Sequence, residues 1–289
     1  MYNIAILGCE NTHANTFLEF IKNDKDFTDV CVAGVYSDDI EAAKKLADLY
    51  GVNIMNRYDE LQGKVDGVMV TARNGANHLK FIKPYLPYGV SVFVDKPVTI
   101  SVAEAEEMMK CFKTYKNRFS GGSVMKYCDE IVAMKKELSE LGADNIVSGF
   151  VKAPAMKNSP YGGLHFYAPH LVEIMCELYG RFPESISAVE NEDCITAIFR
   201  YKSYDITAAF TEMRVSSNYY ALCSAKEKTF LREVNIEQKD FREEFSVFYK
   251  SLKYEVDNPD EKEFISPVYI LNTVEKALKS GKEEKILWQ

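Results

Sequence analysis

Short apolar runs alternate with helical patterns through the first 120 residues, and this alternation constrains the fold more than any other feature of the chain. The apolar runs are too short for globular helices and are rich in Val and Ile, as is typical of buried strands. We expect strands at 4–7, 30–35, 68–70 and 90–94. Helices are expected at 14–21, 40–50, 77–86 and 102–112. Such repetition predicts right-handed crossovers and an α/β domain with a mostly parallel sheet.

The second half has a different pattern, in which β-rich residues dominate. Helices are expected at 129–141, 169–179 and 268–279, and strands at 219–224, 229–234 and 285–288. Two β-rich runs, 195–201 and 204–213, predict a hairpin across residues 202 and 203. The pattern predicts an α+β domain with a mainly antiparallel open sheet. The change falls near residues 120–122, so we expect one domain over 1–120 and a second over 121–289, whose C-terminal segment could pack back on the first.

Charge and cysteine usage limit the classes of partner. The 289 residues carry a formal net charge of −8 with a pI of about 5.3, which disfavours a nucleic-acid binder. No apolar run approaches the length of a membrane span, and the N-terminus enters the first strand without a signal-peptide pattern. Seven cysteines are scattered singly, and four histidines form no cluster with zinc-ligand spacing. We therefore expect a reduced, cytoplasmic protein with no metal site, no nucleic-acid partner and no membrane contact.

Several pieces of the sequence follow the order and spacing of one enzyme family. These pieces are Ile6-Leu7-Gly8, residues 65–71 with His78, Asp95-Lys96-Pro97, Gly162-Gly163 followed by His170, and residues 266–281. Together they resemble the Gfo/Idh/MocA family of NAD(P)-dependent oxidoreductases over nearly the whole chain. The resemblance implies a Rossmann-like N-terminal domain and a C-terminal α/β domain whose open sheet forms oligomer contacts. It also implies a sugar-like or polyol substrate and a homo-oligomer, either a dimer or a tetramer.

The turn after the first strand is the candidate cofactor loop, Gly8-Cys9-Glu10-Asn11-Thr12-His13-Ala14. A dinucleotide fingerprint would have glycines where Glu10 and His13 stand. Asn11 or Thr12 can cap the following helix, leaving its amide groups to face an anion. The alternative is a capped helix in a sheet protein that binds no nucleotide. The resemblance favours the nucleotide, and the expected cofactor contacts are Gly8, Cys9, Asn11, Thr12, His13, Ser37, Asp38, Thr71, Arg73, Asn74, His78, Asp95, Lys96 and Pro97.

The end of the second strand bears on the choice of cofactor. Many NAD enzymes place an acid there to hold the adenosine ribose, and the resemblance puts that position at Ser37. Asp38 and Asp39 would repel the 2′-phosphate of NADP, and no arginine is adjacent. We therefore expect NAD, with NADP as the alternative. The same residues would also serve as a polar turn and a helix N-cap.

Lys96 is the first candidate catalytic residue. It follows a buried apolar run and Asp95, and Pro97 ends the strand because it has no N–H to donate. Sheets of this class bind their ligands at the carboxyl ends of the strands. The resemblance implies that Lys96 hydrogen-bonds the reacting hydroxyl and the nicotinamide ribose, where its cation would stabilise an alkoxide. The alternative is an ordinary solvated lysine.

His170 is the second candidate, near the start of an expected helix. Imidazole suits proton exchange near neutral pH, and the resemblance gives His170 that role. Family members carry an aspartate four residues earlier, where this chain has Phe166. His165 or Tyr167 could replace that aspartate or contact the substrate, and Glu173 could orient the imidazole ring.

Together these residues predict an NAD(P)-dependent oxidoreductase that transfers hydride between nicotinamide and a sugar-like or polyol substrate. Lys126, His165 and Tyr167 are the expected substrate contacts. One alternative is a non-catalytic, nucleotide- or sugar-binding regulatory member of the same fold, motivated by the missing glycines and aspartate. Another is an NAD-assisted elimination or glycoside cleavage. A packing helix and a solvated lysine are the simpler readings of His170 and Lys126.

Overall fold

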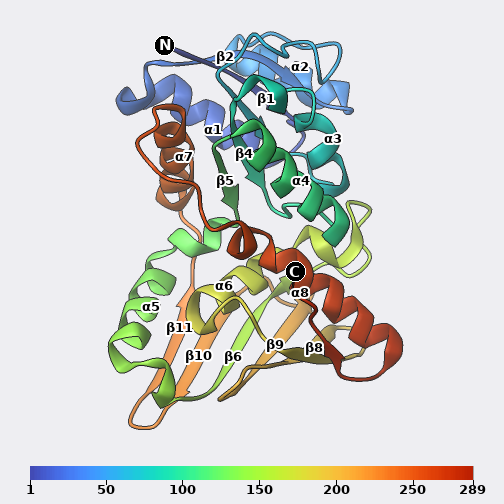
Figure 1. The fold of residues 1–289 in the computed structure, drawn as a ribbon, viewed down its shortest axis with the longest axis vertical. Helices are drawn as coiled ribbons and strands as arrows, with labels where there is room; N and C mark the ends of the chain where they lie inside the picture. The colour runs from blue at the N-terminus through green and yellow to red at the C-terminus, as the bar shows by residue number, and fades with distance from the viewer. Residues whose placement is uncertain (289) are drawn as a thin grey trace. The chain divides into compact units, whose positions relative to one another are not determined.

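The chain divides into two compact units (Figure 1). The structure, a computed structural model, describes residues 1–288. The first unit combines residues 1–122 with 238–264, and the second combines 123–237 with the residues from 265 onward. The first unit is therefore built from two stretches of chain that are more than a hundred residues apart.

A five-stranded parallel sheet forms the centre of the first unit, as the apolar runs predict. Its order is β2-β1-β3-β4-β5. The strands are β1 (Tyr2–Leu7), β2 (Val30–Tyr36), β3 (Gly67–Val70), β4 (Ser91–Asp95) and β5 (Phe119–Gly122). All neighbouring pairs are parallel. Every residue of β3, β4 and β5 is buried, which explains why the first two read as continuous apolar runs.

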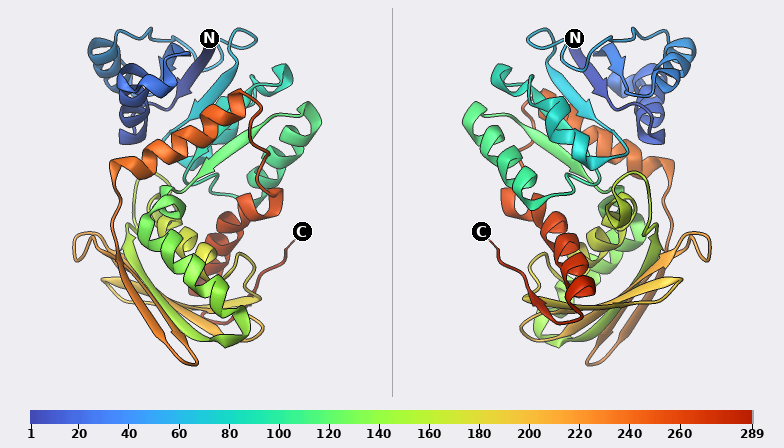
Figure 2. Two further views of the ribbon diagram at one scale, coloured as in Figure 1. Left: turned by 90° about the vertical axis from the view of Figure 1, so that its left-hand side faces the viewer. Right: turned by 90° about the vertical axis from the view of Figure 1, so that its right-hand side faces the viewer.

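Helices cover both faces of this sheet (Figures 1 and 2). They are α1 (Thr12–Asn23), α2 (Ile40–Tyr50), α3 (His78–Ile82), α4 (Val102–Tyr115) and α7 (Gln238–Leu252). The packing of α1 and α7 on one face centres on Phe17, whose ring lies 5.1 Å from that of Phe93 on β4 and 5.8 Å from that of Phe245 on α7. Helix α7 was not expected from the sequence.

A seven-stranded mixed sheet forms the second unit, in the order β11-β10-β6-β9-β8-β7-β12. The strands are β6 (Ile146–Ala155), β7 (Ser185–Glu190), β8 (Cys194–Arg200), β9 (Asp205–Glu212), β10 (Tyr219–Ala225), β11 (Thr229–Val234) and β12 (Glu284–Lys285). All pairs are antiparallel except β6 with β9. The expected fold class, a parallel sheet followed by a mainly antiparallel one, is confirmed.

The second unit carries α5 (Asp129–Leu141), α6 (Pro169–Tyr179) and most of α8 (Glu261–Ser280). The sequence predicts this last helix only over 268–279. The structure starts the helix at Glu261 and keeps Pro267 inside it. Asp260 holds this early start, since its carboxylate accepts hydrogen bonds from the N–H groups of Lys262 and Glu263 at 2.9 and 3.0 Å.

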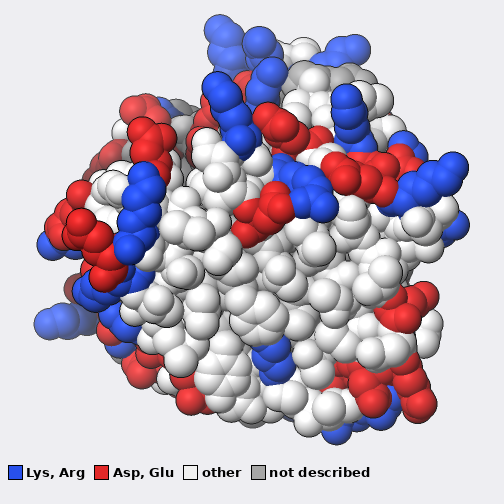
Figure 3. All heavy atoms as spheres, turned by 90° about the horizontal axis from the view of Figure 1, so that it is seen from below, with Lys and Arg blue, Asp and Glu red and all other residues white. Residues whose placement is uncertain are grey.

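The helices of the second unit lie on one face of its sheet, and the other face is not covered by a helix (Figure 2). The strand register aligns one row of outward-facing side chains across five strands: Leu231, Leu222, Phe150, Thr207 and Ile198. We call these residues the open-face row. Seen from below, the molecule has a broad area with few Lys, Arg, Asp or Glu side chains, in keeping with this row (Figure 3).

One sequence expectation for the first unit differs from the structure in detail. The helix expected over 77–86 is short, because α3 ends at Ile82, just before Pro84, and a single turn at Leu86–Tyr88 follows. Residues 119–122 form β5, which ends where the first stretch of the first unit ends, and Gly121 is needed in this strand. Its φ is +115°, and a Cβ at this position would lie 2.0 Å from the Val94 carbonyl oxygen. Within residues 1–288, no helix is both long and apolar enough to cross a membrane.

Candidate functional site

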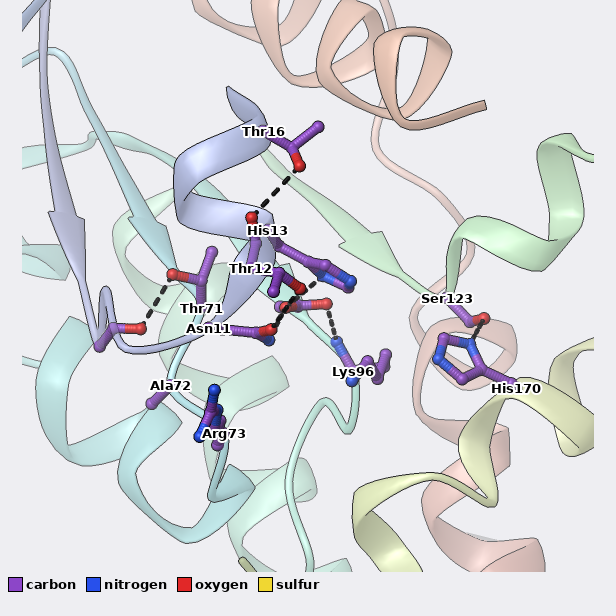
Figure 4. A network of polar contacts seen from close by, with 12 residues as sticks. Asn11, Thr12, His13, Thr16, Thr71, Ala72, Arg73, Lys96, Ser123 and His170 are labelled. Atoms are coloured by element: carbon purple, nitrogen blue, oxygen red, sulfur yellow. Dashed lines mark hydrogen bonds and ion pairs between the residues drawn. The ribbon is translucent and has the colours of Figure 1, made fainter. Parts of the chain in front are cut away.

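Asp95 organises the carboxyl end of β4, where it contacts Asn11, His13 and Lys96, which are labelled in Figure 4. It is fully buried, and its Oδ2 lies 2.7 Å from His13 Nδ1 and accepts a hydrogen bond from Asn11 Nδ2 at 3.0 Å. Its Oδ1 accepts the Lys96 backbone N–H at 2.7 Å. Burial opposes ionisation of this carboxyl, but the charge and hydrogen bond of His13 and the charge of Lys96 outweigh it and lower the pKa of Asp95. The carboxylate therefore ties the first turn of α1 to the end of β4.

Lys96 is buried beside this carboxylate, with only 5 % of its surface exposed. Its peptide bond to Pro97 is cis. Burial is the main influence on the ammonium group and lowers the pKa of Lys96, and the charge of Arg73 acts in the same direction. Asp95 and Glu244 oppose this change. Lys96 is thus a desolvated cation among acidic groups and not a solvated rim charge.

Gly8 and the first turn of α1 form the part of the loop that suits an anion. Gly8 has a φ of +75°, and a Cβ there would lie 2.3 Å from the Cβ of Ala72, so the backbone passes close to the strand end. Asn11 occupies the N-cap position of α1, but its side chain makes no capping hydrogen bond and points to Asp95 instead. This geometry fits the diphosphate of a dinucleotide, which binds at a helix N-terminus.

Glu10 fits a diphosphate less well. Its Oε2 accepts a hydrogen bond from Ser37 Oγ at 2.7 Å, and its Oε1 accepts the Arg73 backbone N–H at 3.0 Å. The carboxylate therefore links the ends of β2 and β3, at a loop position where the usual fingerprint has glycine. For a phosphate to approach the loop, this side chain must turn away. The adjacent Cys9 is buried, and burial together with the Glu10 charge raises the pKa of its thiol to about 12, so the thiol stays protonated.

Of the three residues that follow β2, Ser37 and Asp39 stabilise the local turn, whereas Asp38 is an exposed acid. Ser37 is buried, and its hydroxyl also accepts the Asp39 backbone N–H at 3.0 Å. Asp39 caps α2 through the N–H groups of the first turn, which is the alternative reading from the sequence. Asp38 is exposed and accepts a hydrogen bond from the Tyr36 hydroxyl at 2.6 Å. An acidic group therefore stands at the end of β2, one residue after the expected position.

His78 joins the loops after β3 and β4. It is fully buried, with Nε2 at 2.8 Å from the Ala72 carbonyl oxygen and Nδ1 at 3.2 Å from that of Val98. Burial lowers the pKa of this imidazole. Three other predicted contacts use their side chains locally: Thr12 donates to Asn11 Oδ1 (3.3 Å), Thr71 donates to the Gly8 carbonyl (3.1 Å), and Asn74 accepts the Ala76 N–H (3.1 Å). These residues set the shape of the loops.

His170 lies in the second unit, in the first turn of α6. It is 4 % exposed, and its Nδ1 lies 2.8 Å from Ser123 Oγ (Figure 4). Glu173, which the sequence suggested as an orienting group, instead pairs with Arg181 at 2.6 Å. Sequence reasoning missed Ser123. Its only signal is its place directly after β5, where the chain enters the second unit.

The remaining candidates of the second unit lie around α6. His165 is 3 % exposed, and its Nε2 lies 3.6 Å from a carboxylate oxygen of Glu275 on α8. The nearby His165 imidazole is the main cause that lowers the pKa of Glu275. Tyr167 is packed between the rings of Phe166 and His170, at 5.3 and 5.5 Å, and burial raises its pKa. Lys126 lies in the turn Val124–Tyr127, with its ammonium group 5.3 Å from the centre of the Tyr127 ring.

Sequence reasoning also missed Glu244 on α7. Its carboxylate is 1 % exposed, yet it lies on the helix face that carries Phe245 and Phe248 into the core. No local pattern marks this acid, because its burial depends on how α7 packs on the sheet. No group of three or more His, Cys, Asp or Glu side chains within residues 1–288 could hold a metal ion.

One protein-family model matches the N-terminal part of the chain, and solved structures are similar to it over nearly its whole length. Residues 2–123 match the family model GFO_IDH_MocA, described as an oxidoreductase family with an NAD-binding Rossmann fold. No curated protein matches the chain. Among solved structures, the myo-inositol 2-dehydrogenase of Lactobacillus plantarum is similar with a TM-score of 0.85 at 13 % identity, covering 99 % of both chains.

Two other similar structures contain a cofactor. The scyllo-inositol dehydrogenase of Lactobacillus casei with bound NAD(H) and scyllo-inositol has a TM-score of 0.84 at 12 % identity, covering 99 % of both chains. GenD2 from gentamicin A biosynthesis in complex with NAD has a TM-score of 0.86 at 12 % identity, covering 99 % of this chain and 96 % of that one. At such identities the likeness establishes a common fold.

Proposed function

We propose that the chain is an NAD(H)-dependent dehydrogenase of the Gfo/Idh/MocA type that acts on a CH–OH group, because residues 2–123 match the model of this oxidoreductase family, described as having an NAD-binding Rossmann fold. The proposed substrate is a sugar-like or polyol molecule, as it is for the similar inositol dehydrogenases. The observation that carries the proposal is Lys96, a buried cation held at the end of β4 beside the Asp95 carboxylate.

The roles proposed for the side chains follow from their chemistry. NAD, when bound, supplies the hydride acceptor. Lys96 would donate a hydrogen bond to the reacting hydroxyl and stabilise the alkoxide as its proton leaves, because a desolvated cation is most effective where water does not screen it. His170 would accept or return that proton through Nε2, since Ser123 engages Nδ1. Lys126, His165 and Tyr167 are proposed to contact the substrate.

Cofactor binding and turnover test the proposal in sequence. Titrating NADH and NADPH while following nicotinamide fluorescence should show binding, with NADH favoured. A panel of polyols monitored at the nicotinamide absorbance should then show turnover that Lys96→Ala abolishes. Lys45→Ala is the matched control, because Lys45 is exposed on α2. A well-folded sample that binds neither cofactor would refute the dehydrogenase.

A binding or regulatory member of the same fold is the second candidate. The Glu10 carboxylate in the cofactor loop favours it, because the group must move before a phosphate approaches. Phe166, which packs between Tyr161 and Tyr167, also stands where family members carry an aspartate. Cofactor binding without turnover of any polyol would support this candidate over the dehydrogenase.

We further propose that the chain forms a homo-oligomer through the open-face row. Rows of exposed apolar side chains across a sheet are typical of protein interfaces, and Leu231 at one end of the row is 60 % exposed. Leu222→Lys should then reduce the mass measured by light scattering to that of a single chain. A wild-type protein that is already monomeric at micromolar concentration would contradict this proposal.

The thiols support the expected cytoplasmic location. None of the seven cysteines, all within residues 1–288, forms a disulfide bond, and four of them are buried. Free thiols persist in reducing compartments. Cell fractionation with an antibody against the chain would test the location directly.

A further inference from the structure

Helix α7 runs alongside β4 in the opposite direction. At the C-terminal end of α7, the Ser251 carbonyl oxygen accepts a hydrogen bond from the hydroxyl of Ser91, the first residue of β4, at 3.1 Å. Further along the strand, the rings of Phe93 and Phe248 lie 6.1 Å apart. Two strand residues span roughly 6.6 Å and three helix residues roughly 4.5 Å, so the two elements advance at comparable rates.

The next helical turn therefore reaches the end of the strand. One turn before Phe248, the helix presents Glu244, at the level of Asp95 and Lys96. The contact between Phe241 and His13, with ring centres 5.0 Å apart, supports this alignment from α1. His13 is itself 2.7 Å from Asp95.

Burial requires a counter-charge for Glu244. The residue is 1 % exposed, and a carboxylate so far from water is rarely ionised without a cation nearby. Asp95 already receives His13, Asn11 and the Lys96 backbone N–H. Lys96, which is 5 % exposed, provides a buried cation at the same level, and the charge of Glu244 favours its ammonium form.

We propose that Glu244 is a positioning residue whose negative charge, acting without a direct hydrogen bond, keeps the Lys96 ammonium group protonated at the end of β4. The catalytic consequence rests on the proposed function, whereas the relation between the two charges does not. In this arrangement a helix from the far end of the chain completes the first unit's candidate site.

The direction of the effect follows from the groups that face Lys96. Asp95 on β4 and Glu244 on α7 favour the charged ammonium, whereas burial and the charge of Arg73, after β3, oppose it. His13 on α1 faces Asp95, and a second buried acid, Asp240, lies one turn before Glu244. His78, also buried, acts on Asp95. Removing the Glu244 charge deletes one of the two attractions, so the pKa of Lys96 should fall.

The experiment compares Glu244→Gln with Glu243→Gln in the full chain without cofactor. Glu243 is the neighbouring residue and is exposed, so the same chemical change there is the matched control. Lysine side chains labelled with 13C at Cε are titrated by NMR, and the Lys96 signal is assigned by its loss in Lys96→Arg. We expect the midpoint of Lys96 to fall by about one pH unit in Glu244→Gln, a tenfold loss of proton affinity. No change is expected in Glu243→Gln.

An unchanged midpoint in Glu244→Gln would overturn the proposal. If that variant does not fold, Glu244→Asp keeps the charge but withdraws it by one methylene, and a smaller downward shift is expected. An unchanged midpoint in Glu244→Asp would then overturn the proposal. Where turnover is found, the alkaline limb of the kcat profile should move to lower pH in Glu244→Gln with little change in KM. The NMR result holds even if the chain turns over no polyol, so the two proposals fail separately.

Discussion

Replacing Asp95 by Asn would test the central network of the first unit with almost no change of shape. The carboxylate accepts two donors at Oδ2, from His13 and Asn11, and one at Oδ1, from Lys96 N–H. An amide can keep its oxygen at the Oδ2 position, but its NH2 group then faces the Lys96 N–H. Two buried donors would point at each other, and the negative charge beside the Lys96 ammonium would be lost.

The magnitude follows from these losses. A buried donor left without an acceptor costs about 1–3 kcal/mol, and breaking a buried charge pair by removing one partner costs about 3–5 kcal/mol. The two costs overlap, so we expect Asp95→Asn to lower the free energy of unfolding of the first unit by about 3–5 kcal/mol at pH 7. Asp38→Asn is the control, because Asp38 is exposed and accepts a single hydrogen bond from Tyr36.

The pH dependence has a definite sign. The folded-state pKa of Asp95 is lowered from its usual 3.8. Its stabilisation is therefore complete above about pH 5 and is lost as the pH falls through the lower folded-state value. The difference between wild type and Asp95→Asn should shrink accordingly below pH 4.

Hydrogen exchange of the β1, β3 and β4 amides is the appropriate assay, because it reports on the first unit alone. The only tryptophan, Trp288, belongs to the second unit, so its fluorescence would report on the wrong part of the chain. At pH 7 these amides should exchange about 10²- to 10⁴-fold faster in Asp95→Asn. A difference below about 1 kcal/mol at pH 7, or one that does not shrink on acidification, would refute the reasoning.

Three further changes probe the loop after β1 and the imidazole of the second unit. Glu10→Gln removes the negative charge that links the ends of β2 and β3 and that would repel a phosphate. The affinity for NADH in a fluorescence titration should therefore rise by about 5- to 20-fold, or roughly 1–2 kcal/mol. Weaker binding would show that the carboxylate serves the cofactor. Gly8→Ala places a Cβ 2.3 Å from the Cβ of Ala72, at a φ of +75°. The free energy of unfolding of the first unit, measured with urea, should fall by about 3 kcal/mol or more. An unaltered stability would contradict the close approach of the two backbones. Ser123→Ala removes the contact with His170 Nδ1. The kcat of the active enzyme should fall about tenfold, while the free energy of unfolding falls by about 1 kcal/mol. An unchanged kcat would show that Ser123 has no part in the proposed proton transfer.

Local patterns were sufficient to predict most of the first unit. Buried parallel strands such as β3 and β4 carry their own signal, because both faces of the sheet are covered and every position favours an apolar residue. The Asp95-Lys96-Pro97 turn was likewise readable, since an abrupt change from apolar to charged residues marks the end of a strand. The match of residues 2–123 to the family model confirms the resemblance drawn from these pieces.

Long-range pairings could not be predicted in this way. The contact of Phe93 with Phe248 joins residues that no local pattern relates, and Glu244 looks like any helical acid until α7 is placed on the sheet. Glu10 is another case, because its partners Ser37 and Arg73 lie 27 and 63 residues away. Ser123 and His170 are separated by 47 residues. Each of these contacts depends on which strand ends come together, which is a property of the folded sheet.

The place of α7 also affects how the chain is made. When residues 1–122 have left the ribosome, the helix that covers Phe17 and Phe93 has not been synthesised. That face of the nascent sheet must wait for more than a hundred further residues, with its aromatic side chains exposed to other chains and to chaperones. A truncated chain that ends at residue 122 would remain in this state permanently. The N-terminal sheet is therefore fully covered only after α7 has been synthesised, although its strands are made first.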